Sequence, residues 1–174
     1  MNSEYTVKYH APERKELTND EIVELHVKAH KDRLLKTVFY DGSCRTPQEF
    51  MRFVKDPAFC FMAVYDKNLT PAACCWLNGF SGRAALINFF VYRDFFGCQS
   101  FDIGHMVCDI CLKPNEHGEA FLDTLYGITP RCNRAALGFV EGLGFKRIAR
   151  LPNVCDFNGR IMPGILTIKE YEHG

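Results

Sequence analysis

Three side chains of types that bind metal ions lie at helical spacing in one segment of the chain. His105, Cys108 and Cys111 follow one another at three-residue intervals, so a helix would place them within about 120° on one side. The spacing is compatible with a zinc- or thiol-based redox module. A structural zinc site normally has four ligands, however, and the sequence contains no second paired motif. Buried cysteines behave as small hydrophobes and explain the spacing better, so we predict no metal site.

A second stretch of chemical interest, NRAALGFVEGLGF, begins at Asn133. Asn is a good N-cap because its side chain accepts a hydrogen bond from a backbone N–H that has no partner inside the helix. Gly144 suits the left-handed residue after a helix, where a Cβ would clash, and Phe145 would begin the next strand. The stretch predicts a helix that begins at Asn133, with its amide as the cap, and ends before Gly144.

The composition favours one globular domain in a chain of 174 residues, of which 47% are hydrophobic. The 21 basic and 21 acidic residues cancel, whereas a nucleic-acid-binding domain usually shows a basic excess. The N-terminus lacks the apolar region of a signal peptide, and the longest apolar run, residues 84–92, is far shorter than the ~20 residues that span a bilayer. We predict a cytoplasmic protein with no nucleic-acid and no membrane partner.

Cysteine is abundant, with nine residues. The number is odd and no export signal is visible, so a disulfide framework is not expected. Most of the cysteines lie inside apolar segments, where a reduced thiol packs as a small apolar side chain. We predict free thiols and no structural disulfide.

Elements that would position these residues can be read along the chain. A capping box at Thr18 and Glu21 starts one helix, and Thr46 followed by Pro47 starts another. A loop entering a further helix is expected at residues 97–113, and the last helix is expected from Asn133 to the residue before Gly144. Strands are expected at residues 5–10, 59–65, 72–77, 84–92, 119–127, 146–150 and 164–171.

This order predicts a mixed α/β (α+β) fold of about seven strands and four helices around one sheet. The three strands between residues 59 and 92 have short connections, so they should form an antiparallel meander. The strand at 84–92, the next helix and the strand at 119–127 should form a right-handed βαβ crossover.

The order, together with the stretch from Asn133, resembles the GNAT superfamily of acyl-coenzyme-A-dependent N-acetyltransferases. Members often end with Asn-x-x-Ala-x-x-Phe-Tyr-Glu-x-x-Gly-Phe, and this chain carries the Asn, Ala, Phe, Glu, Gly and Phe in register from Asn133 to Phe145. Residues 127–130 look like the loop that many members place before the Asn. The resemblance implies a single GNAT-like domain over residues 1–174, with acetyl-CoA as co-substrate.

The resemblance also implies where acetyl-CoA would bind. Asn133 would lie near the pantetheine arm, and the backbone amide of Val91 or Tyr92 would polarise the thioester carbonyl. Backbone N–H groups of the loop before the next helix would hold the pyrophosphate. The implied cofactor-binding residues are Val91, Tyr92, Phe96, Gly97, Cys98, Gln99, Ser100 and Asn133.

The loop departs from the family motif Gln/Arg-x-x-Gly-x-Gly/Ala. Aligned through Val91, the first motif position is Phe96, and the two small positions are Gln99 and Phe101. A shifted register places Gly97 at the glycine position, with Asp94 first. Neither register reproduces the motif.

Candidates for acid–base chemistry are few. Asn88 interrupts an apolar strand and could orient a water molecule, but an amide cannot act as a base. Asp123 is a candidate base, with a solvated carboxylate or an ion pair as the alternative. Many members carry a catalytic Tyr where this chain has Val140, so Tyr126 is the candidate acid, with an amphipathic aromatic at a strand end as the alternative.

Two functions follow from the resemblance. The first is an N-acetyltransferase that transfers an acetyl group from acetyl-CoA to a primary amine, on a small molecule or a peptide, of unknown identity. The second is a non-catalytic GNAT-fold binding or structural module with a degenerate coenzyme A site. The aromatic content leaves room for a homodimer face in either case.

Overall fold

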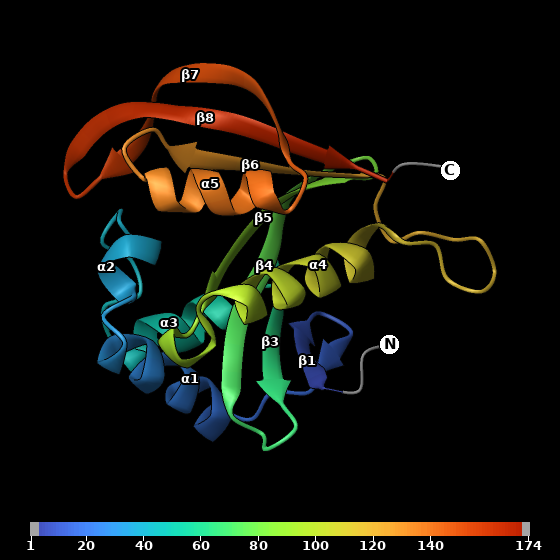
Figure 1. Ribbon diagram of the computed structural model, residues 1–174. Coiled ribbons are helices and arrows are strands. Elements are labelled where there is room, and N and C mark those ends of the chain that lie inside the picture. Colours follow the sequence, from blue (N-terminus) through green and yellow to red (C-terminus); the bar gives the residue numbers. More distant parts are fainter. Residues whose placement is uncertain (1–3, 172–174) are drawn as a thin grey trace. The chain divides into compact units, whose positions relative to one another are not determined.

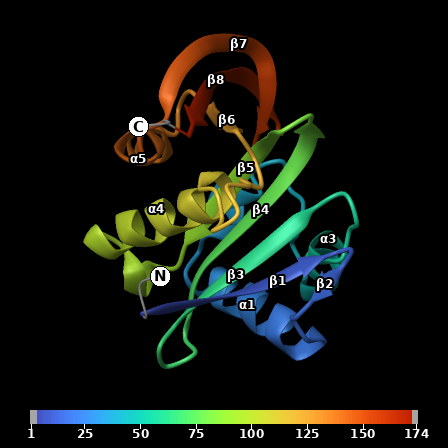
Figure 2. The same ribbon diagram turned by 90° about the vertical axis from the view of Figure 1, so that its right-hand side faces the viewer.

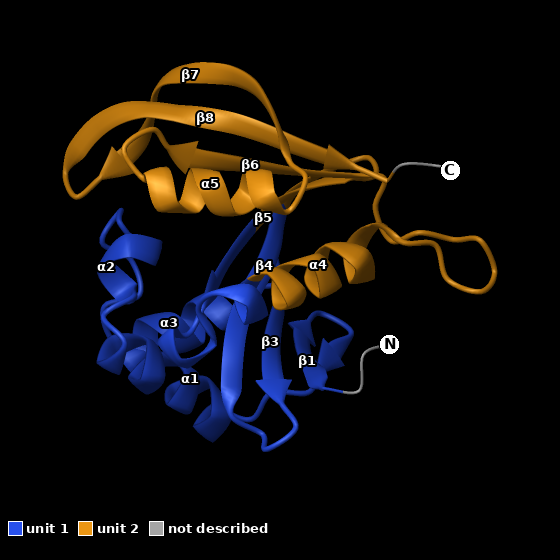
Figure 3. Cartoon of the chain, viewed as in Figure 1, with its two compact units in different colours: residues 1–78, 88–100 blue, residues 79–87, 101–174 orange. Residues whose placement is uncertain are grey.

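The computed structural model describes residues 4–171 and divides the chain into two compact units (Figure 3). The first unit holds the residues up to 78 together with 88–100, and the second holds 79–87 together with the residues from 101 onwards. Strands β4 (Pro71–Ser81) and β5 (Ala84–Val91) contribute residues to both units. The single domain expected over residues 1–174 stays a prediction.

The first unit is built on strands in the order β2-β1-β3-β4-β5 (Figures 1 and 2). Strand β1 pairs antiparallel with β2 and β3, and β3 pairs antiparallel with β4. Its elements besides β4 and β5 are β1 (Tyr5–Ala11), β2 (Arg14–Lys15), α1 (Asn19–Lys31), α2 (Leu35–Val38), α3 (Pro47–Val54), β3 (Cys60–Asp66) and the 3-10 helix η1 (Arg93–Phe95).

The second unit continues the strand order as β4-β5-β6-β8-β7. Strand β5 pairs parallel with β6, from Ala84 beside Thr124 to Leu86 beside Tyr126, and this connection runs through a helix as expected. Strand β8 pairs antiparallel with both β6 and β7. The elements are β6 (Thr124–Pro130), α5 (Arg134–Gly142), β7 (Lys146–Phe157), β8 (Arg160–Glu170) and helix α4 (Cys98–Leu112) from residue 101.

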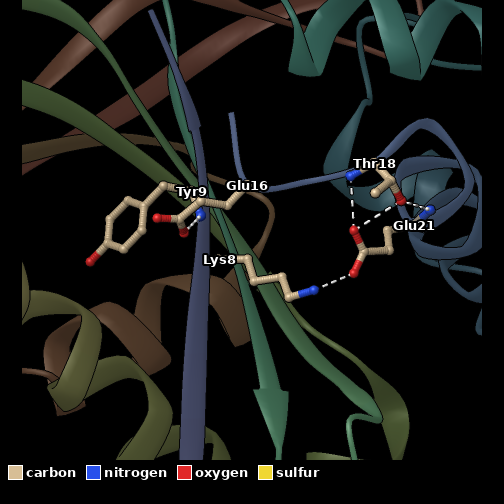
Figure 4. Close-up of polar contacts among 5 residues, drawn as sticks. All are labelled: Lys8, Tyr9, Glu16, Thr18 and Glu21. Atoms are coloured by element: carbon tan, nitrogen blue, oxygen red, sulfur yellow. Dashed lines mark hydrogen bonds and ion pairs between the residues drawn. The ribbon is translucent and has the colours of Figure 1, made fainter. Parts of the chain in front are cut away.

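The start of α1 confirms the expected capping box (Figure 4). The Thr18 side chain accepts a hydrogen bond from the Glu21 N–H at 3.2 Å, and the Glu21 carboxylate accepts one from the Thr18 N–H at 2.8 Å. Lys8 of β1 pairs with the same carboxylate, and the Tyr9 N–H donates to the Glu16 carboxylate at 2.9 Å. The cap thus fastens α1 to the sheet as well as starting it.

Helix α3 carries the aromatic core of the first unit. Its capping box at Thr46 is also as expected. Phe50 meets Phe61 of β3 edge to face, with ring centroids 5.9 Å apart, and Phe53 meets Trp76 of β4 in the same way at 5.1 Å. Such pairs are worth about 0.5–1.5 kcal/mol each beyond the burial of their area. They hold α3 against the strands that lead to β5.

Two glycines allow α4 and α5 to approach closely in the second unit. A Cβ on Gly142 of α5 would lie 2.4 Å from the Phe101 ring, and a Cβ on Gly104 of α4 would lie 2.8 Å from Leu143. The rings of Phe101 and Phe139 also meet across this contact in a tilted arrangement, with centroids 5.1 Å apart. Small residues therefore set the distance between these two helices.

The structure corrects several expected strand limits. The strand expected over 119–127 begins at Thr124 and runs to Pro130, so residues 127–130, expected as a loop, are strand. Pairing with β8 up to Gly164 beside Pro130 keeps them extended. The strand expected over 146–150 runs on to Phe157 because a bulge after Leu151 accommodates Pro152. The elements not expected are the two-residue β2, the four-residue α2 and the 3-10 helix η1.

Helix α5 follows the expected pattern. Asn133 is its N-cap, and Gly144, two residues beyond Gly142, has φ +88°. All nine cysteines are free thiols. Across residues 4–171, none of the helices is both long enough and apolar enough to cross a membrane.

Candidate active site

The two backbone amides expected at the thioester differ in their environment. The Tyr92 N–H donates to the Ala72 carbonyl of β4 at 2.9 Å. Tyr92 has an extended backbone, with φ −71° and ψ 150°, and successive residues of an extended strand direct their N–H groups to opposite edges. The Val91 N–H is therefore directed away from β4. Of the two amides, the Val91 amide is therefore the one that takes no part in the pairing with β4.

The Tyr92 side chain belongs to the core. It is fully buried, its hydroxyl donates to the Leu25 carbonyl of α1 at 2.8 Å, and the Cys74 sulfur of β4 lies 3.4 Å from the same oxygen. Burial raises the pKa of Tyr92 well above its usual value. A phenol so placed joins the sheet to α1 and stays protonated.

The loop after β5 is anchored to α1 at Arg93 and Asp94. The Asp32 carboxylate accepts a hydrogen bond from the Arg93 N–H at 2.9 Å, and the Arg93 Nε donates to the Asp32 carbonyl at 2.5 Å. Asp32 is the C-cap of α1 and is only 8% exposed. At the next residue, Lys28 pairs with Asp94 at 2.5 Å. Nothing local in the sequence indicated either partner in α1.

Gly97 forms the junction between this loop and α4. Its φ is +88°, a conformation that favours glycine, and a Cβ built there would meet no described atom within 4 Å. The Gly97 carbonyl accepts hydrogen bonds from the Ser100 N–H at 3.1 Å and the Ser100 hydroxyl at 2.6 Å. The glycine thus leaves open space over the first turn of α4.

The first turn of α4 presents backbone donors. Helix geometry leaves the first N–H groups, including those of Cys98 and Gln99, without partners inside the helix, and the helix dipole makes this end favourable for anions. The side chains of Phe96, Cys98 and Gln99 are exposed, whereas Ser100 is buried. A pyrophosphate can be held here through the backbone even though the family's glycines are replaced.

Asn88 is paired with a residue that the sequence did not single out. Its Nδ2 donates to Asn78 Oδ1 of the neighbouring strand β4 at 3.2 Å, and both side chains are half-buried. The pair leaves further donor and acceptor positions on two amides. It fits the expected role of orienting water and supplies no base.

Asn133 lies in the second unit and acts as a cap. Its Oδ1 accepts a hydrogen bond from the Ala136 N–H at 3.2 Å, so the side-chain oxygen is engaged by the first turn of α5. Further along α5, a Cβ on Gly138 would meet no described atom within 4 Å. Open space therefore lies beside α5 at Gly138, within the second unit.

The Tyr126 hydroxyl is engaged by the backbone. It donates to the Gly79 carbonyl at 2.7 Å. Gly79 has φ +57°, and a Cβ there would lie 2.9 Å from the same hydroxyl, so the glycine makes the hydrogen bond sterically feasible. This arrangement favours the alternative in which Tyr126 is a strand aromatic that fastens β6 to β4.

The Asp123 carboxylate forms a two-pronged ion pair with Arg83. Arg83 Nε and an Arg83 amino nitrogen lie 2.6 Å and 2.9 Å from its two oxygens. Asp123 raises the pKa of the guanidinium above its usual value. Both groups are more than half exposed. The geometry favours the ion-pair alternative over a base.

The remaining polar clusters lie elsewhere. Cys108 and Cys111 are buried and His105 is exposed, and burial raises the pKa of the Cys108 thiol to about 11. Within residues 4–171, no group of three His, Cys, Asp or Glu side chains is placed to hold a metal ion. A cavity of about 370 Å³ in the second unit is lined by residues of α4, β7 and β8, among them Lys113 and Lys169, and by none of the candidate site residues.

Comparison with solved structures establishes the fold. The chain matches the crystal structure of a spermidine N-acetyltransferase from Vibrio cholerae in complex with CoA and spermine, with a TM-score of 0.74 and 15% identity over 97% of this chain and 96% of that chain. It also matches a structure from Vibrio cholerae assigned as a ribosomal-protein-serine acetyltransferase, with a TM-score of 0.74 and 15% identity over 98% and 96%. No family model matches the chain, and no curated protein matches its sequence. The expected GNAT fold is confirmed.

Proposed function

We propose that the chain is an N-acetyltransferase that moves an acetyl group from acetyl-CoA to a primary amine. One observation carries the proposal: the fold matches acetyltransferase structures over at least 95% of this chain and of theirs, one of them in complex with CoA. Fold alone does not fix function. The local features of the site therefore have to support the same chemistry.

The donor would be held mainly by the backbone of the first unit. The open space at Gly97 and the N–H groups at the start of α4 suit a pyrophosphate. Asp32 fixes the beginning of this loop through Arg93. A loop whose ends are already ordered loses less conformational entropy when a ligand binds. This smaller loss favours binding at a site that makes few side-chain contacts.

The reaction requires one bond to form and one to break. The neutral amine attacks the thioester carbonyl, the C–N bond forms, and the C–S bond breaks to release the coenzyme A thiolate, which takes up a proton. The Val91 N–H would stabilise the oxyanion that develops on the carbonyl, since the Tyr92 N–H is bonded to Ala72. We assign the donor of that stabilisation to Val91.

We propose that the candidate acid–base side chains do not themselves transfer the proton. Asn88, paired with Asn78, would orient a water molecule that accepts the amine proton. Asp123 and Tyr126 are each engaged, by Arg83 and by the Gly79 carbonyl. We therefore propose that water relays the proton and that these two residues support the second unit.

The acceptor is proposed to be a small-molecule or peptide amine. The matched spermidine N-acetyltransferase was solved with spermine, which makes polyamines the first class to test. Polyamine recognition requires carboxylates near the amine, and the sequence shows no dense acidic cluster. A monoamine or a peptide amine is the next class. A homodimer and a cytoplasmic location remain predictions.

A non-catalytic module is the second candidate, and the loop favours it. Phe96 stands where the family has Gln or Arg and is 56% exposed, and Gln99 stands at a glycine position. Side chains at these positions leave less room for a pyrophosphate to reach the backbone N–H groups at the start of α4. Such a chain would keep the fold and bind no coenzyme A.

The proposal is tested by incubating the purified, reduced protein with acetyl-CoA and a panel of spermidine, spermine, simple monoamines and peptides with free amines. Acetylated product is measured by mass spectrometry, because the nine protein thiols would interfere with thiol detection. Product from at least one amine, absent without protein, supports the enzyme. The absence of product from every amine, together with the absence of acetyl-CoA binding, would favour the non-catalytic module.

A further inference from the structure

Three sulfur-containing side chains lie near one another in the second unit, on β7, on β8 and just beyond the end of β6, where the strand order is β6-β8-β7. Met162 of β8 lies directly opposite Cys155 of β7 in the antiparallel register. On the other side, Pro130 lies opposite Gly164, and the Arg131 N–H continues the pairing by donating to the Pro163 carbonyl at 3.0 Å. The next residue, Cys132, therefore comes beside Met162.

Two of the three sulfur atoms are in contact, and the third belongs to the cross-strand neighbour of Met162. Cys132 Sγ lies 3.4 Å from Met162 Sδ. A Cβ on Gly164 would lie 2.9 Å from Cys155 Sγ and 2.7 Å from Ile128 of β6. The Cys155 thiol thus leans over β8 toward β6, in space that only a glycine at 164 leaves open. Both thiols are directed over the strand that carries Met162.

We propose that Cys132, Met162 and Cys155 form a binding site for Cu(I). Two thiolates and one thioether are soft ligands, and this set selects Cu(I) over zinc, which prefers thiolate, imidazole and carboxylate. Binding would release the protons of the two thiols and leave the copper oxidation state unchanged. No histidine or carboxylate is required.

The exposure of the three residues suits metal entry. Cys132 is exposed, Met162 is half-buried, and Cys155 is 3% exposed. An ion can therefore meet the outer thiol first and then reach the inner ligands. A buried thiol shields the bound ion from water, which protects Cu(I) from reaction with solvent oxidants.

A disulfide is not the alternative use of these thiols. Cys132 and Cys155 flank Met162 from two different strands, and two strand spacings amount to about 9.5 Å. A disulfide requires Cα atoms less than about 7 Å apart. A metal ion that also takes the thioether between them needs no such approach.

The test uses anaerobic titration of the reduced full-length chain with Cu(I) in competition with a chromophoric Cu(I) chelator. Wild type should hold one Cu(I) per chain and show ultraviolet thiolate-to-copper absorption. Cys132→Ser should weaken binding at least about tenfold, and Met162→Leu, which preserves volume, should also weaken it. Cys98→Ser is the matched control, since Cys98 and Cys132 are the exposed cysteines of the chain, and it should bind as wild type does.

Circular dichroism and thermal melting establish that each variant is folded. Cys132→Ser that holds Cu(I) as tightly as wild type would overturn the site, and so would an equal loss in Cys98→Ser. Wild type that yields all Cu(I) to the chelator would also overturn it. These readouts involve no acetyl transfer, so their outcome is independent of the proposed enzyme activity.

Discussion

The Tyr92 N–H donates to the Ala72 carbonyl at 2.9 Å, and this hydrogen bond separates the roles of two adjacent amides. One amide completes the strand pairing, and the amide of Val91 points to the opposite edge. Oxyanion stabilisation by a single donor is commonly worth about 10²- to 10³-fold in kcat. The distinction between residues 91 and 92 is therefore large enough to measure.

Replacing each amide by an ester, through incorporation of an α-hydroxy acid, removes one N–H at a time. We expect the ester at Val91 to lower kcat by about 10²- to 10³-fold with little change in melting temperature. The ester at Tyr92 should leave kcat nearly unchanged but lower stability by about 1 kcal/mol, because a buried hydrogen bond is lost. The reverse pattern in steady-state kinetics and thermal melting would assign the oxyanion donor to Tyr92.

We expect Asp32, the C-cap of α1, to hold the loop after β5 in the conformation that binds acetyl-CoA. Asp32→Ala removes the buried carboxylate that accepts from the Arg93 N–H, so we expect a several-fold rise in KM for acetyl-CoA with little change in kcat. Asp94→Ala is the matched control in the same loop, because it removes only the exposed pair with Lys28. It should leave both constants unchanged. Equal effects of the two substitutions would show that Asp32 has no special anchoring role.

Tyr126 is expected to be structural. Tyr126→Phe removes the hydrogen bond to the Gly79 carbonyl, which should lower stability by about 1 kcal/mol and change kcat by no more than about twofold. Gly79→Ala disturbs the same contact from the other side, since its Cβ would lie 2.9 Å from the hydroxyl. The two losses should be non-additive in a double-mutant cycle. A fall of kcat by about 10²-fold or more in Tyr126→Phe would instead identify the general acid.

Acid should destabilise the first unit through His26. This side chain is 3% exposed, contacts the Cys44 carbonyl at 3.2 Å, and has a buried Nδ1 that meets no hydrogen-bond partner among the described residues. Burial lowers its pKa below 6.5 in the folded chain. Below pH 6.5 the unfolded chain therefore binds a proton that the folded chain does not, so stability falls as the pH falls.

The check is urea unfolding at several pH values between 7.5 and 5. We expect the free energy of unfolding to decline below pH 6.5, and His26→Gln, which keeps a donor for the Cys44 carbonyl, to flatten this decline. The His10 imidazole also has a pKa lowered by burial, so part of the decline should persist in the variant. An identical pH dependence in His26→Gln would remove His26 from the explanation.

Local sequence signals predicted the helix starts well. The caps at Thr18, Thr46 and Asn133 depend on residues within three positions of each other, and all three are present in the structure. The strand limit near Thr124 depends on pairing with β5, which lies far away in the sequence, and the limit near Pro152 depends on a bulge in the pairing with β8. Local patterns do not contain that information, so those limits were misplaced.

The same reasoning applies to the candidate site. The sequence singled out Val91, Tyr92 and Gly97 through the family resemblance, but the partners that give them different roles lie elsewhere. Ala72 is 20 residues before Tyr92 in the chain, and Asp32 is in α1, 61 residues before Arg93. Only the fold brings these groups together. The phosphate-loop motif differs from that of the family, so binding of a pyrophosphate would depend on backbone geometry. The amino-acid sequence does not show that geometry directly.

Calorimetric titration of the reduced protein with acetyl-CoA is the first measurement to make, because it shows whether the chain binds the acetyl donor through the Gly97 loop. Desulfo-CoA serves as a comparison ligand. Gly97→Trp fills the open space over the first turn of α4, and Gly118→Trp is the matched control. Both glycines have positive φ, +88° and +78°, and open space at the Cβ position. The two variants therefore carry similar backbone strain.

We expect wild type and Gly118→Trp to bind acetyl-CoA saturably, with a dissociation constant on the order of micromolar. Gly97→Trp should lose affinity for acetyl-CoA by at least about tenfold. Equal binding by the two variants would place the pyrophosphate away from the Gly97 loop. No binding by folded wild-type protein at millimolar acetyl-CoA would contradict the acetyltransferase and leave a non-catalytic GNAT-fold module.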